Sequence, residues 1–505
     1  MKSAGTVYLV GAGPGDAGLL TLRGAELLGR ADVILYDALV NRDLLRLAPI
    51  EAERIYTGKR SQDHAFSQEE LNKLLVSKAR EGKTVIRLKG GDPYVFGRGG
   101  EEAAVLAAAK IPFEVVPGVS AAFAVPAAAG IPLTHRDHCS SFTVLTGYDN
   151  PEKYGQGLDF AEVAKIPGTK VILMGVARIR ELATRLVENG MSPETPVALV
   201  RWGTTGRQQT VEGTLATIAD AVEKSGFTPP AVTIIGDVVK LRGTLNWFEK
   251  RPLFGKRIVI TRSRDQAGQL SLQLRELGAD VLEIPTIRIV PTDRKKDLGD
   301  AIIALNSYDW LVFTSPNGVE SFFEIFFRGF DDLRDIGGVR IAAVGPATAA
   351  KLHELHLKVD VMPGDYVAAK IAKALATYES LENLKILLLR AEVATPELPN
   401  ALEALGAIVD DVAVYKNIPE TEDLNGAAAR LKEDGADWIT FTSASTVENF
   451  HARFDLPALL KQFPALRLAS IGPETTKALE TLGLHAHVEA KIHTIDGLLK
   501  ALIAK

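Results

Sequence analysis

The sequence predicts an α/β protein made of two consecutive two-lobed units. Strand-like hydrophobic runs alternate with amphipathic helical stretches, a pattern typical of α/β architecture. At 505 residues the chain is longer than one hydrophobic core usually supports, and its second half contains an internal repeat. The strands expected in the first half are Thr6–Val10, Val33–Tyr36, Thr84–Leu88, Phe113–Val116, Phe142–Thr146, Lys170–Met174, Val197–Arg201 and Ala231–Gly236.

The two units meet at a short aromatic and basic stretch. The last strand of the first half ends at Gly236, and the residues Trp247–Pro252 precede a new strand at Arg257–Thr261. This change of texture indicates a domain boundary. We therefore expect a first unit over residues 1–245 with lobes of about 1–112 and 113–245, a linker over 246–255, and a second unit over 256–505.

The second half repeats itself at a spacing of 128 residues. The paired segments are IVITR from Ile258 and ILLLR from Ile386, LGADV from Leu277 and LGAIV from Leu405, and DWLVFTSPNGVESF from Asp309 and DWITFTSASTVENF from Asp437. A fourth pair, VGPATAAKL and IGPETTKAL, follows in the same order at a spacing of 127 residues. Matches in one order indicate an ancestral duplication, which predicts two similar lobes.

Composition limits the classes of function. The net charge is −5; residues 1–250 carry 29 Lys and Arg against 28 Asp and Glu, and the remainder carries 29 against 35. Neither half has the basic excess typical of nucleic-acid binding. Cys139 is the only cysteine, which fits a reducing compartment, and no run approaches the roughly 20 apolar residues of a membrane span. We expect a cytoplasmic protein with no nucleic-acid partner, no membrane segment and no metal motif.

A glycine-rich loop, Gly11–Asp16 (GAGPGD), follows the first strand. Glycines at such a place let the backbone turn tightly and bring free N–H groups to a ligand. A dinucleotide-binding loop would have a third glycine where Asp16 stands, and Pro14 interrupts the pattern. A carboxylate would repel a pyrophosphate, so the loop disfavours a nicotinamide oxidoreductase. A simple tight turn remains the alternative.

A more specific set of motifs follows. These are RLKGGDPYVFGRGGEE (Arg87–Glu102), VVPGVSAA (Val115–Ala122) and GIPLTHRD (Gly130–Asp137), together with YDALV, GKR, LMG, WGTT and LNWF. With these motifs the chain closely resembles uroporphyrinogen-III C-methyltransferases, in the tetrapyrrole methylase family, over nearly all of residues 4–250. The resemblance implies a two-lobed tetrapyrrole methylase fold with S-adenosyl-L-methionine bound between the lobes.

The resemblance also implies the cofactor contacts. Carried over by motif, they are Pro14, Gly90, Gly91, Asp92, Val95, Ser120, Ala121, Met174, Gly203 and Ala231. The chemistry of these residues agrees, because the cofactor needs backbone N–H donors for its carboxylate and an acceptor for its ammonium or ribose hydroxyls. Asp92 can be that acceptor, and Met174 and Val95 suit an adenine slot.

Methyl transfer to an electron-rich pyrrole carbon depends on positioning and on a base that removes the pyrrole proton. The family assigns proton acceptance to the Asp of YD, here Asp37, and a donor role to the Lys of GKR, here Lys59. The plainer alternatives are a helix cap or turn residue for Asp37 and a solvated lysine for Lys59. The carboxylate-rich substrate needs cations, for which the candidates are Arg60, Arg98, His135 and Arg136.

In the second half, small hydroxyl residues follow buried strands and precede helices. Such strand–helix junctions are ready-made anion sites, although ordinary helix capping explains any single one. With its FTSPNGV, VGPATA and IGPETT motifs, the region of about 255–505 resembles uroporphyrinogen-III synthase. The residues that would hold substrate carboxylates are Thr314, Ser315, Thr348, Thr442, Ser443, Thr475 and Thr476.

Tyr415 is the candidate catalytic residue of this half. The family closes linear hydroxymethylbilane with inversion of ring D and no cofactor, and Tyr415 would assist departure of the hydroxyl group. It aligns with Ile287 in the repeat, so it is a polar exception at an apolar position. A strand tyrosine with its hydroxyl in water is the alternative. The resemblance also implies exchanged lobes, of about 256–290 plus 418–505 and of 291–417.

These observations predict a bifunctional enzyme that acts on small-molecule tetrapyrroles. It would make uroporphyrinogen III from hydroxymethylbilane and methylate it at C2 and C7 to give precorrin-2, a precursor of sirohaem and cobalamin. The family also implies a homodimer formed through the methyltransferase half. The alternatives are a methylase of a different corrinoid intermediate and, for the second half, a two-lobed tetrapyrrole-binding module.

Overall fold

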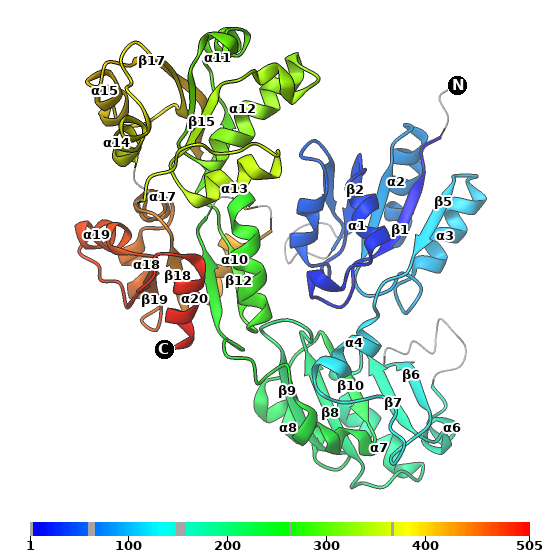
Figure 1. Ribbon diagram of the computed structural model, residues 1–505. Helices are drawn as coiled ribbons and strands as arrows, with labels where there is room; N and C mark the ends of the chain where they lie inside the picture. The colour runs from blue at the N-terminus through cyan, green and yellow to red at the C-terminus, as the bar shows by residue number, and fades with distance from the viewer. Residues whose placement is uncertain (1–3, 59–65, 148–157, 263, 365–367, 424) are drawn as a thin grey trace.

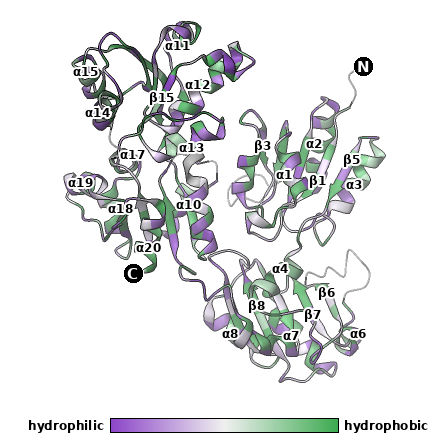
Figure 2. Ribbon diagram, in the orientation of Figure 1, coloured by the Kyte–Doolittle hydropathy of each residue, from purple (hydrophilic) through white to green (hydrophobic). Residues whose placement is uncertain are grey.

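The computed structural model describes residues 4–58, 66–147, 158–262, 264–364, 368–423 and 425–505. Its strands form four five-stranded sheets, each the centre of one lobe (Figure 1). Each sheet separates two clusters of buried hydrophobic residues, and helices cover both faces. Figure 2 shows hydrophobic residues concentrated along the strands, with polar residues common on the surrounding helices. Within the described ranges, no helix is both long and hydrophobic enough to cross a membrane.

Lobe I (residues 4–116) is a parallel sheet with strand order β3-β2-β4-β1-β5. Its elements are β1 (Val7–Gly11), η1 (Ala17–Leu19), α1 (Leu22–Leu28), β2 (Val33–Tyr36), η2 (Arg42–Leu47), β3 (Glu53–Tyr56), α2 (Gln68–Arg80), β4 (Val85–Lys89), α3 (Gly99–Ala108) and β5 (Phe113–Val116). Because β5 pairs with β1, this sheet extends past the boundary expected at 112. The carboxyl ends of the parallel strands share one edge, where ligands bind in such sheets.

Lobe II (residues 121–245) has a mixed sheet with strand order β6-β7-β10-β8-β9, in which only β6 and β7 are parallel. Its elements are α4 (Ala121–Ala128), β6 (Phe142–Thr146), α6 (Phe160–Lys165), β7 (Thr169–Leu173), η3 (Val176–Arg178), α7 (Ile179–Glu188), β8 (Pro196–Arg201), β9 (Gln209–Thr214), α8 (Ile218–Ser225), β10 (Ala231–Ile235), η4 (Asp237–Leu241) and α9 (Arg242–Leu245). The edge strands β3 and β9 are absent from the sequence-based prediction because both are polar and only partly buried.

The segment 246–255 packs tightly between the two halves. The indole N–H of Trp247 donates to the carbonyl of Ala127 at 3.0 Å, and Phe248 and Leu253 are buried. Glu249 accepts hydrogen bonds from Arg242, Gln208 and Thr210, and these bonds together with the Arg242 charge lower the pKa of its carboxyl against the opposing effect of burial. The connection is therefore part of the folded structure.

Lobe III combines both ends of the second half, residues 256–286 and 420–505, in a parallel sheet with strand order β12-β11-β18-β19-β20. Its elements are β11 (Arg257–Ile260), α10 (Arg264–Glu276), β12 (Asp280–Glu283), α16 (Ala427–Asp434), β18 (Trp438–Phe441), α17 (Ala444–Phe454), α18 (Leu456–Gln462), β19 (Arg467–Ser470), α19 (Pro473–Thr481), β20 (Val488–Glu489) and α20 (Ile495–Ile503).

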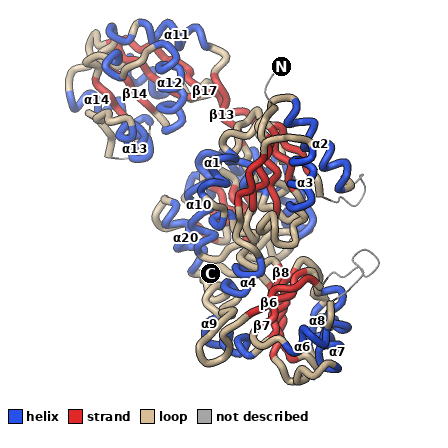
Figure 3. Tube along the Cα trace, turned by 90° about the vertical axis from the view of Figure 1, so that its right-hand side faces the viewer, coloured by secondary structure: helices blue, strands red, loops and turns tan. Residues whose placement is uncertain are grey.

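Lobe IV (residues 287–419) has strand order β13-β17-β16-β14-β15 and stands apart from lobe III in the side view (Figure 3). Its elements are β13 (Ile287–Pro291), α11 (Lys295–Ile303), η5 (Leu305–Ser307), β14 (Trp310–Phe313), α12 (Pro316–Gly329), η6 (Leu333–Ile336), β15 (Arg340–Ala343), α13 (Pro346–Glu354), α14 (Ala368–Tyr378), β16 (Lys385–Ala391), α15 (Glu397–Glu403) and β17 (Ile408–Pro419). Since β13 pairs with β17, lobe IV begins a few residues before the boundary expected near 290.

The two copies of the repeat are exchanged between lobes III and IV. The strand order β12-β11-β18-β19 in lobe III corresponds to β17-β16-β14-β15 in lobe IV, at the spacing seen in the sequence. Each sheet therefore takes its first strand pair from one copy and its second pair from the other. Two chain segments, near 284–286 and 420–426, connect the lobes.

The two halves of the chain are joined by charged contacts between η2 of lobe I and lobe III. Arg275 donates to Asp43 at 2.6 Å and to Glu283 at 3.2 Å, and Arg46 also pairs with Glu283. Glu283 is buried, so losing one of these partners would leave a buried carboxylate with fewer hydrogen bonds. Lobe II contacts lobe III as well, because the backbone of Gly206 lies against Ala279.

Replacing Arg275 with alanine tests this contact. We expect Arg275→Ala to lower the free energy of unfolding by about 1–3 kcal/mol, because a buried carboxylate loses a charged hydrogen-bond donor. Arg328→Ala is the matched control, since Arg328 pairs with Glu324 on an exposed face of α12, and a change within about 0.5 kcal/mol is expected. Equal losses for the two variants in urea titrations would contradict a structural role for the contact.

Candidate active sites

Three backbone segments cross at Gly11, Gly91 and Gly118, next to the carboxyl edge of the lobe I sheet. A Cβ atom on Gly118 would lie 2.2 Å from the carbonyl oxygen of Gly91, and one on Gly11 would lie 2.5 Å from the Cα atom of Gly118. Gly13 and Gly91 also exchange backbone hydrogen bonds of 2.7 and 3.2 Å. Glycine is required here because the backbones touch, and Gly13 and Gly91 have positive φ angles.

The side chain of Asp92 secures this crossing. One carboxylate oxygen accepts the N–H of Gly118 at 3.0 Å and the other accepts the N–H of Tyr94 at 2.8 Å. The sequence predicts Asp92 as an acceptor for the cofactor, and the structure shows that both oxygens already accept backbone donors. A carboxylate has further lone pairs, so it can accept one more hydrogen bond.

The amino end of α4 lies beside Gly91. Ser120 caps the helix through its hydroxyl, which accepts the N–H of Ala122 at 3.3 Å. A Cβ on Gly91 would make only ordinary van der Waals contact with the N atom of Ala121, at 3.8 Å, so the turn at Gly91 lies directly beside this helix end. Free N–H groups and the helix dipole favour an anion such as a carboxylate at this place.

Lobe II contributes three predicted residues from one edge of its sheet. Ala231 begins β10 opposite Arg201 at the end of β8, and Met174 follows β7, the other neighbour of β10. Met174 has a φ of 56° and is about half exposed (53%), so it projects from the edge. Gly203 packs against Val125 of α4, where a Cβ would lie 2.6 Å away.

The loops of lobes I and II meet directly. The N–H of Asp16 donates to the hydroxyl of Thr204 at 3.1 Å, and a Cβ on Gly15 would lie 2.9 Å from Thr205. Pro14 lies in this same loop, next to Gly15. Thr204 and Gly118 lie within the motifs WGTT and VVPGVSAA, but nothing in the sequence marks either residue as a contact between segments.

The predicted base, Asp37, follows β2 and is partly exposed. One carboxylate oxygen accepts the N–H of Leu39 at 3.1 Å, and the other lies 3.8 Å from an Nη atom of Arg87. Leu39 in turn packs on Gly90, where a Cβ would lie 2.8 Å from the Leu39 Cβ. Asp37 therefore occupies a turn, which agrees with the alternative of a helix cap or turn residue. Its second carboxylate oxygen faces the Arg87 guanidinium, next to the predicted cofactor loops.

The remaining predicted residues of lobe I are less constrained. Val95 lies half-buried in the turn that follows Asp92. Arg98 has a φ of 59° at the start of α3, and its exposed guanidinium pairs with Glu101 at 3.5 Å. Lys59 and Arg60 lie outside the described residues.

Two predicted cations of lobe II lie in the turn before β6. His135 accepts the N–H of Asp137 at 3.2 Å, and its ring lies 5.0 Å from that of His138. Arg136 is exposed. Within the described ranges, no group of three or more His, Cys, Asp or Glu could hold a metal ion.

In lobe IV the predicted tyrosine and one predicted hydroxyl residue come together. Tyr415, on β17, is buried (6% exposed), and its hydroxyl lies 3.0 Å from that of Ser315. Ser315 follows β14 and caps α12 by accepting the N–H of Gly318 at 3.1 Å. Thr314 precedes it, and Thr348 is buried on α13, which follows β15. The Tyr415 side chain is therefore buried, in contrast to the alternative of a strand tyrosine with its hydroxyl in water.

Lobe III places its predicted residues at the equivalent strand–helix junctions. Thr442 and Ser443 follow β18, and Ser443 forms a capping box with Thr446. Thr475 and Thr476 begin α19, after β19. The hydroxyl of Thr476 contacts Glu489 and lies 2.7 Å from the Ser470 hydroxyl, so its hydrogen is already donated to a carboxylate.

Arg262 is a further cation in lobe III that sequence reasoning missed. It follows β11, and because β11 and β18 are parallel, it lies at the same edge of the sheet as Thr442. Burial lowers the pKa of its guanidinium. Its only sequence signal is the position of TRS after a strand.

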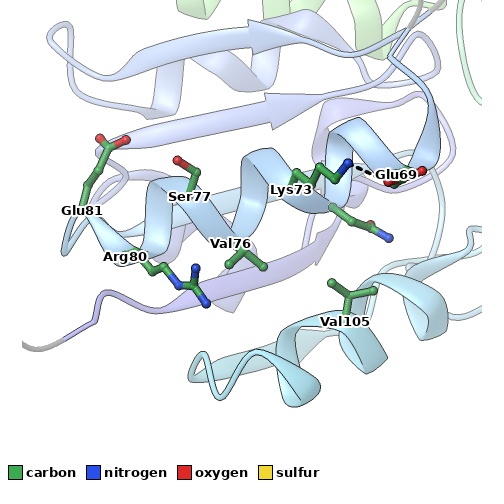
Figure 4. A pocket seen from close by; sticks show the side chains of 8 residues that line it. Glu69, Lys73, Val76, Ser77, Arg80, Glu81 and Val105 are labelled. Carbon is green, nitrogen blue, oxygen red and sulfur yellow. Dashed lines mark ion pairs between the residues drawn. The ribbon is translucent and has the colours of Figure 1, made fainter.

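A hollow of about 700 Å³ lies away from these loops, between α2 and α3 (Figure 4). Residues of α2 line most of it, including Glu69 and Lys73, which form an ion pair of 2.6 Å. Val105 of α3 closes the other side. Because none of the predicted site residues lines it, we do not assign catalysis to it.

Comparison with known proteins matches each half to a family. Residues 6–219 match the model of the Tetrapyrrole (Corrin/Porphyrin) Methylases, and residues 268–500 match that of Uroporphyrinogen-III synthase HemD. The Porphyrin biosynthesis protein HemD of Ruminiclostridium josui is 39% identical over 501 residues, which cover 99% of this chain and 98% of the relative.

Two further relatives match part of this chain. The Uroporphyrinogen-III C-methyltransferase of Bacillus subtilis (strain 168) is 42% identical over 66% of this chain and 68% of its own length. The S-adenosyl-L-methionine-dependent uroporphyrinogen III methyltransferase of Methanosarcina barkeri is 52% identical over 48% of this chain and 94% of its own length.

The glycine crossing yields a direct test. We expect Gly118→Ala to lower the free energy of unfolding of the first half by about 1–3 kcal/mol, because the new methyl group overlaps the Gly91 carbonyl. Gly100→Ala is the control, since a Cβ there meets nothing within 4 Å and alanine favours the helix α3 by about 0.5–1 kcal/mol. Thermal unfolding in which both variants behave alike would contradict the crossing.

Proposed function

We infer that this chain, which belongs to the tetrapyrrole methylases in its first half and to the uroporphyrinogen-III synthases in its second half, is a bifunctional enzyme of tetrapyrrole biosynthesis. The first half is a uroporphyrinogen-III C-methyltransferase that uses S-adenosyl-L-methionine, and the second half is a uroporphyrinogen-III synthase. The finer proposal is that the second half makes uroporphyrinogen III from hydroxymethylbilane with inversion of ring D. The first half then methylates it at C2 and C7 to give precorrin-2.

The observation that carries the methyltransferase assignment is the convergence of loops from both lobes. The contact between Asp16 and Thr204 brings the glycine crossing of lobe I to the Gly203 loop of lobe II. The residues present fit S-adenosyl-L-methionine. The space beside Gly91 and the N-terminus of α4 suit its carboxylate, Asp92 can still accept from its ammonium or ribose, and the exposed Met174 is an apolar surface for adenine.

Bound cofactor supplies an electrophilic methyl group. The protein's task is to hold the acceptor carbon of the pyrrole in line with that methyl group and to exclude water. Once the carbon–carbon bond has formed and the carbon–sulfur bond has broken, the ring must lose a proton to restore conjugation. We assign acceptance of that proton to Asp37, whose partly exposed carboxylate lies beside the cofactor loops. Arg98, His135, Arg136, Lys59 and Arg60 would bind substrate carboxylates.

For the synthase half, we propose that the Tyr415 hydroxyl assists loss of the hydroxyl group of hydroxymethylbilane. The support is its burial and its 3.0 Å contact with Ser315, which fix the position of the phenol. The N-termini of α12, α13, α17 and α19 would bind substrate carboxylates through N–H groups and the hydroxyls of Thr314, Ser315, Thr348, Thr442, Ser443 and Thr475. Arg262 adds a positive charge at the same edge of lobe III. Thr476 is weaker in this role, because its hydroxyl contacts Glu489.

We further propose a cytoplasmic homodimer that forms through the methyltransferase half. The support is the family resemblance of this half and the single cysteine of the chain. Light scattering of the purified protein measures the oligomeric state.

One assay tests the bifunctional proposal. Hydroxymethylbilane is supplied with or without S-adenosyl-L-methionine, and isomer composition and absorbance are followed. We expect the type III isomer without cofactor and the precorrin-2 chromophore with it. Formation of the type I isomer alone would contradict the synthase activity, and an unmethylated type III product with cofactor would contradict the methyltransferase activity.

Asp37→Asn separates binding from catalysis in the first half. The amide keeps the shape of the side chain but is a poor proton acceptor, so we expect methylation to fall about a hundredfold or more. Calorimetric binding of S-adenosylhomocysteine should stay within about twofold of the unsubstituted protein. Full methylation by this variant would remove Asp37 as the base.

Tyr415→Phe makes the equivalent test in the second half. Loss of the hydroxyl should slow formation of the type III isomer about tenfold or more, because departure of the hydroxyl group loses its hydrogen-bond donor. Ser315→Ala is the comparison, with a smaller effect expected because it removes only the partner of the phenol. An unchanged synthase rate in Tyr415→Phe would exclude the proposed role.

A further inference from the structure

A buried cluster of charges lies beneath Asp37 in lobe I. Arg87 and Lys89 alternate on the central strand β4, and both side chains are about 95% buried. Glu102 of α3 is completely buried and pairs with both, at 3.3 Å from Arg87 and 2.9 Å from Lys89. Burying two cations in a hydrophobic strand costs desolvation free energy unless their charges are balanced. Clusters of buried charges of this kind are common at functional sites.

The sheet register brings this cluster to the proposed base. Leu35 of β2 pairs with Arg87 of β4, and the next pair is Tyr36 with Leu88, so Asp37 follows β2 beside Lys89. One end of Arg87 lies 3.3 Å from Glu102 and the other lies 3.8 Å from Asp37. The guanidinium therefore bridges a buried carboxylate and a partly exposed one.

The remaining contacts fix the direction of Arg87. Its Nη1 atom lies 3.3–3.5 Å from the carbonyls of Leu35 and Leu88 and from the hydroxyl of Thr57. On Glu102, one oxygen meets both cations and Gln68, and the other has no partner within the described residues. Burial lowers the pKa of Lys89, Arg87 lowers it further, and Glu102 and Asp37 oppose this. The cluster therefore contains two basic side chains, Arg87 and Lys89, and two acidic ones, Glu102 and Asp37.

We propose that Arg87, held by Glu102, is a positioning residue for methyl transfer that orients the Asp37 carboxylate and supplies the positive charge beside it. Asp37 is the one member of the cluster that is substantially exposed (29% of its side chain), so it alone can meet the substrate. Arg87 acts through Asp37 and does not touch the reacting atoms. This inference rests on the assignment of Asp37 as the proton acceptor.

The pH dependence of methylation distinguishes this role from a purely structural one. The titratable groups on the elements around Asp37 are Arg87 and Lys89 of β4, Glu101 and Glu102 of α3, Tyr36 of β2, and Glu53, Arg54 and Tyr56 of β3. Lys59 and Arg60, which follow β3, lie outside the described residues. Removing a nearby positive charge makes a carboxylate easier to protonate, and removing a nearby negative charge does the opposite.

The test compares two substitutions, one that removes a positive charge and one that removes a negative charge. Each is made in the full chain, and methylation is assayed with uroporphyrinogen III and S-adenosyl-L-methionine. Arg87→Met should move the acidic limb of the kcat profile to higher pH by about one unit or more and lower kcat about tenfold at neutral pH. Glu102→Gln should move the same limb to lower pH. Binding of S-adenosylhomocysteine should remain within about twofold in both variants.

Lys170→Met is the matched control, because Lys170 is a buried lysine of lobe II whose ammonium donates to the carbonyl of Ile166. It should leave the acidic limb in place. Unshifted limbs in both variants, or shifts in the same direction, would overturn the positioning role. If Arg87→Met does not fold, the Glu102→Gln profile decides alone, since an unshifted limb overturns the proposal. Full methylation by Asp37→Asn would instead overturn the proposed base.

Discussion

The contact of three backbones at Gly11, Gly91 and Gly118 is the constraint on which the methyltransferase site depends. A side chain at Gly11 or Gly118 would push β1, the turn after β4 and the segment before α4 apart, and glycine at position 91 provides the positive φ angle of that turn. Because no side chain intervenes, the carboxyl ends of the strands, the capped end of α4 and the carboxylates Asp37 and Asp92 gather around one point. The loop after β8 of lobe II reaches lobe I at Thr204.

The two halves arrange their charged and polar groups in different ways. Lobe I buries a balanced group of charges and leaves the carboxylate of Asp37 partly exposed. Lobes III and IV offer helix N-termini and hydroxyls, which bind carboxylates without the cost of buried charge. The exchange of the repeat places these junctions in both lobes, and the contact of Asp43 with Arg275 holds lobe III against the methyltransferase.

Sequence patterns were most informative where chemistry and backbone geometry coincide. The glycine motifs located the loops, and the duplication located the equivalent junctions of lobes III and IV. Both features can be recognised because they depend on particular residue types at fixed positions in the sequence. Edge strands such as β9 were not predicted because they are polar. The assignment of β13 to lobe IV was not predicted either, because it depends on pairing with β17, which is distant in sequence. The alternation of Arg87 and Lys89 within a hydrophobic run was a visible signal, but its partner Glu102 is known only from the packing of α3 on the sheet.

The central claim is that one chain holds two independent active sites, and mixing two inactivated variants tests it most directly. Asp37→Asn retains the synthase site and Tyr415→Phe retains the methyltransferase site. Each variant alone should convert hydroxymethylbilane to precorrin-2 slowly, whereas an equimolar mixture should approach half the rate of the unsubstituted protein. A mixture no faster than the better single variant would contradict independent sites on the two halves.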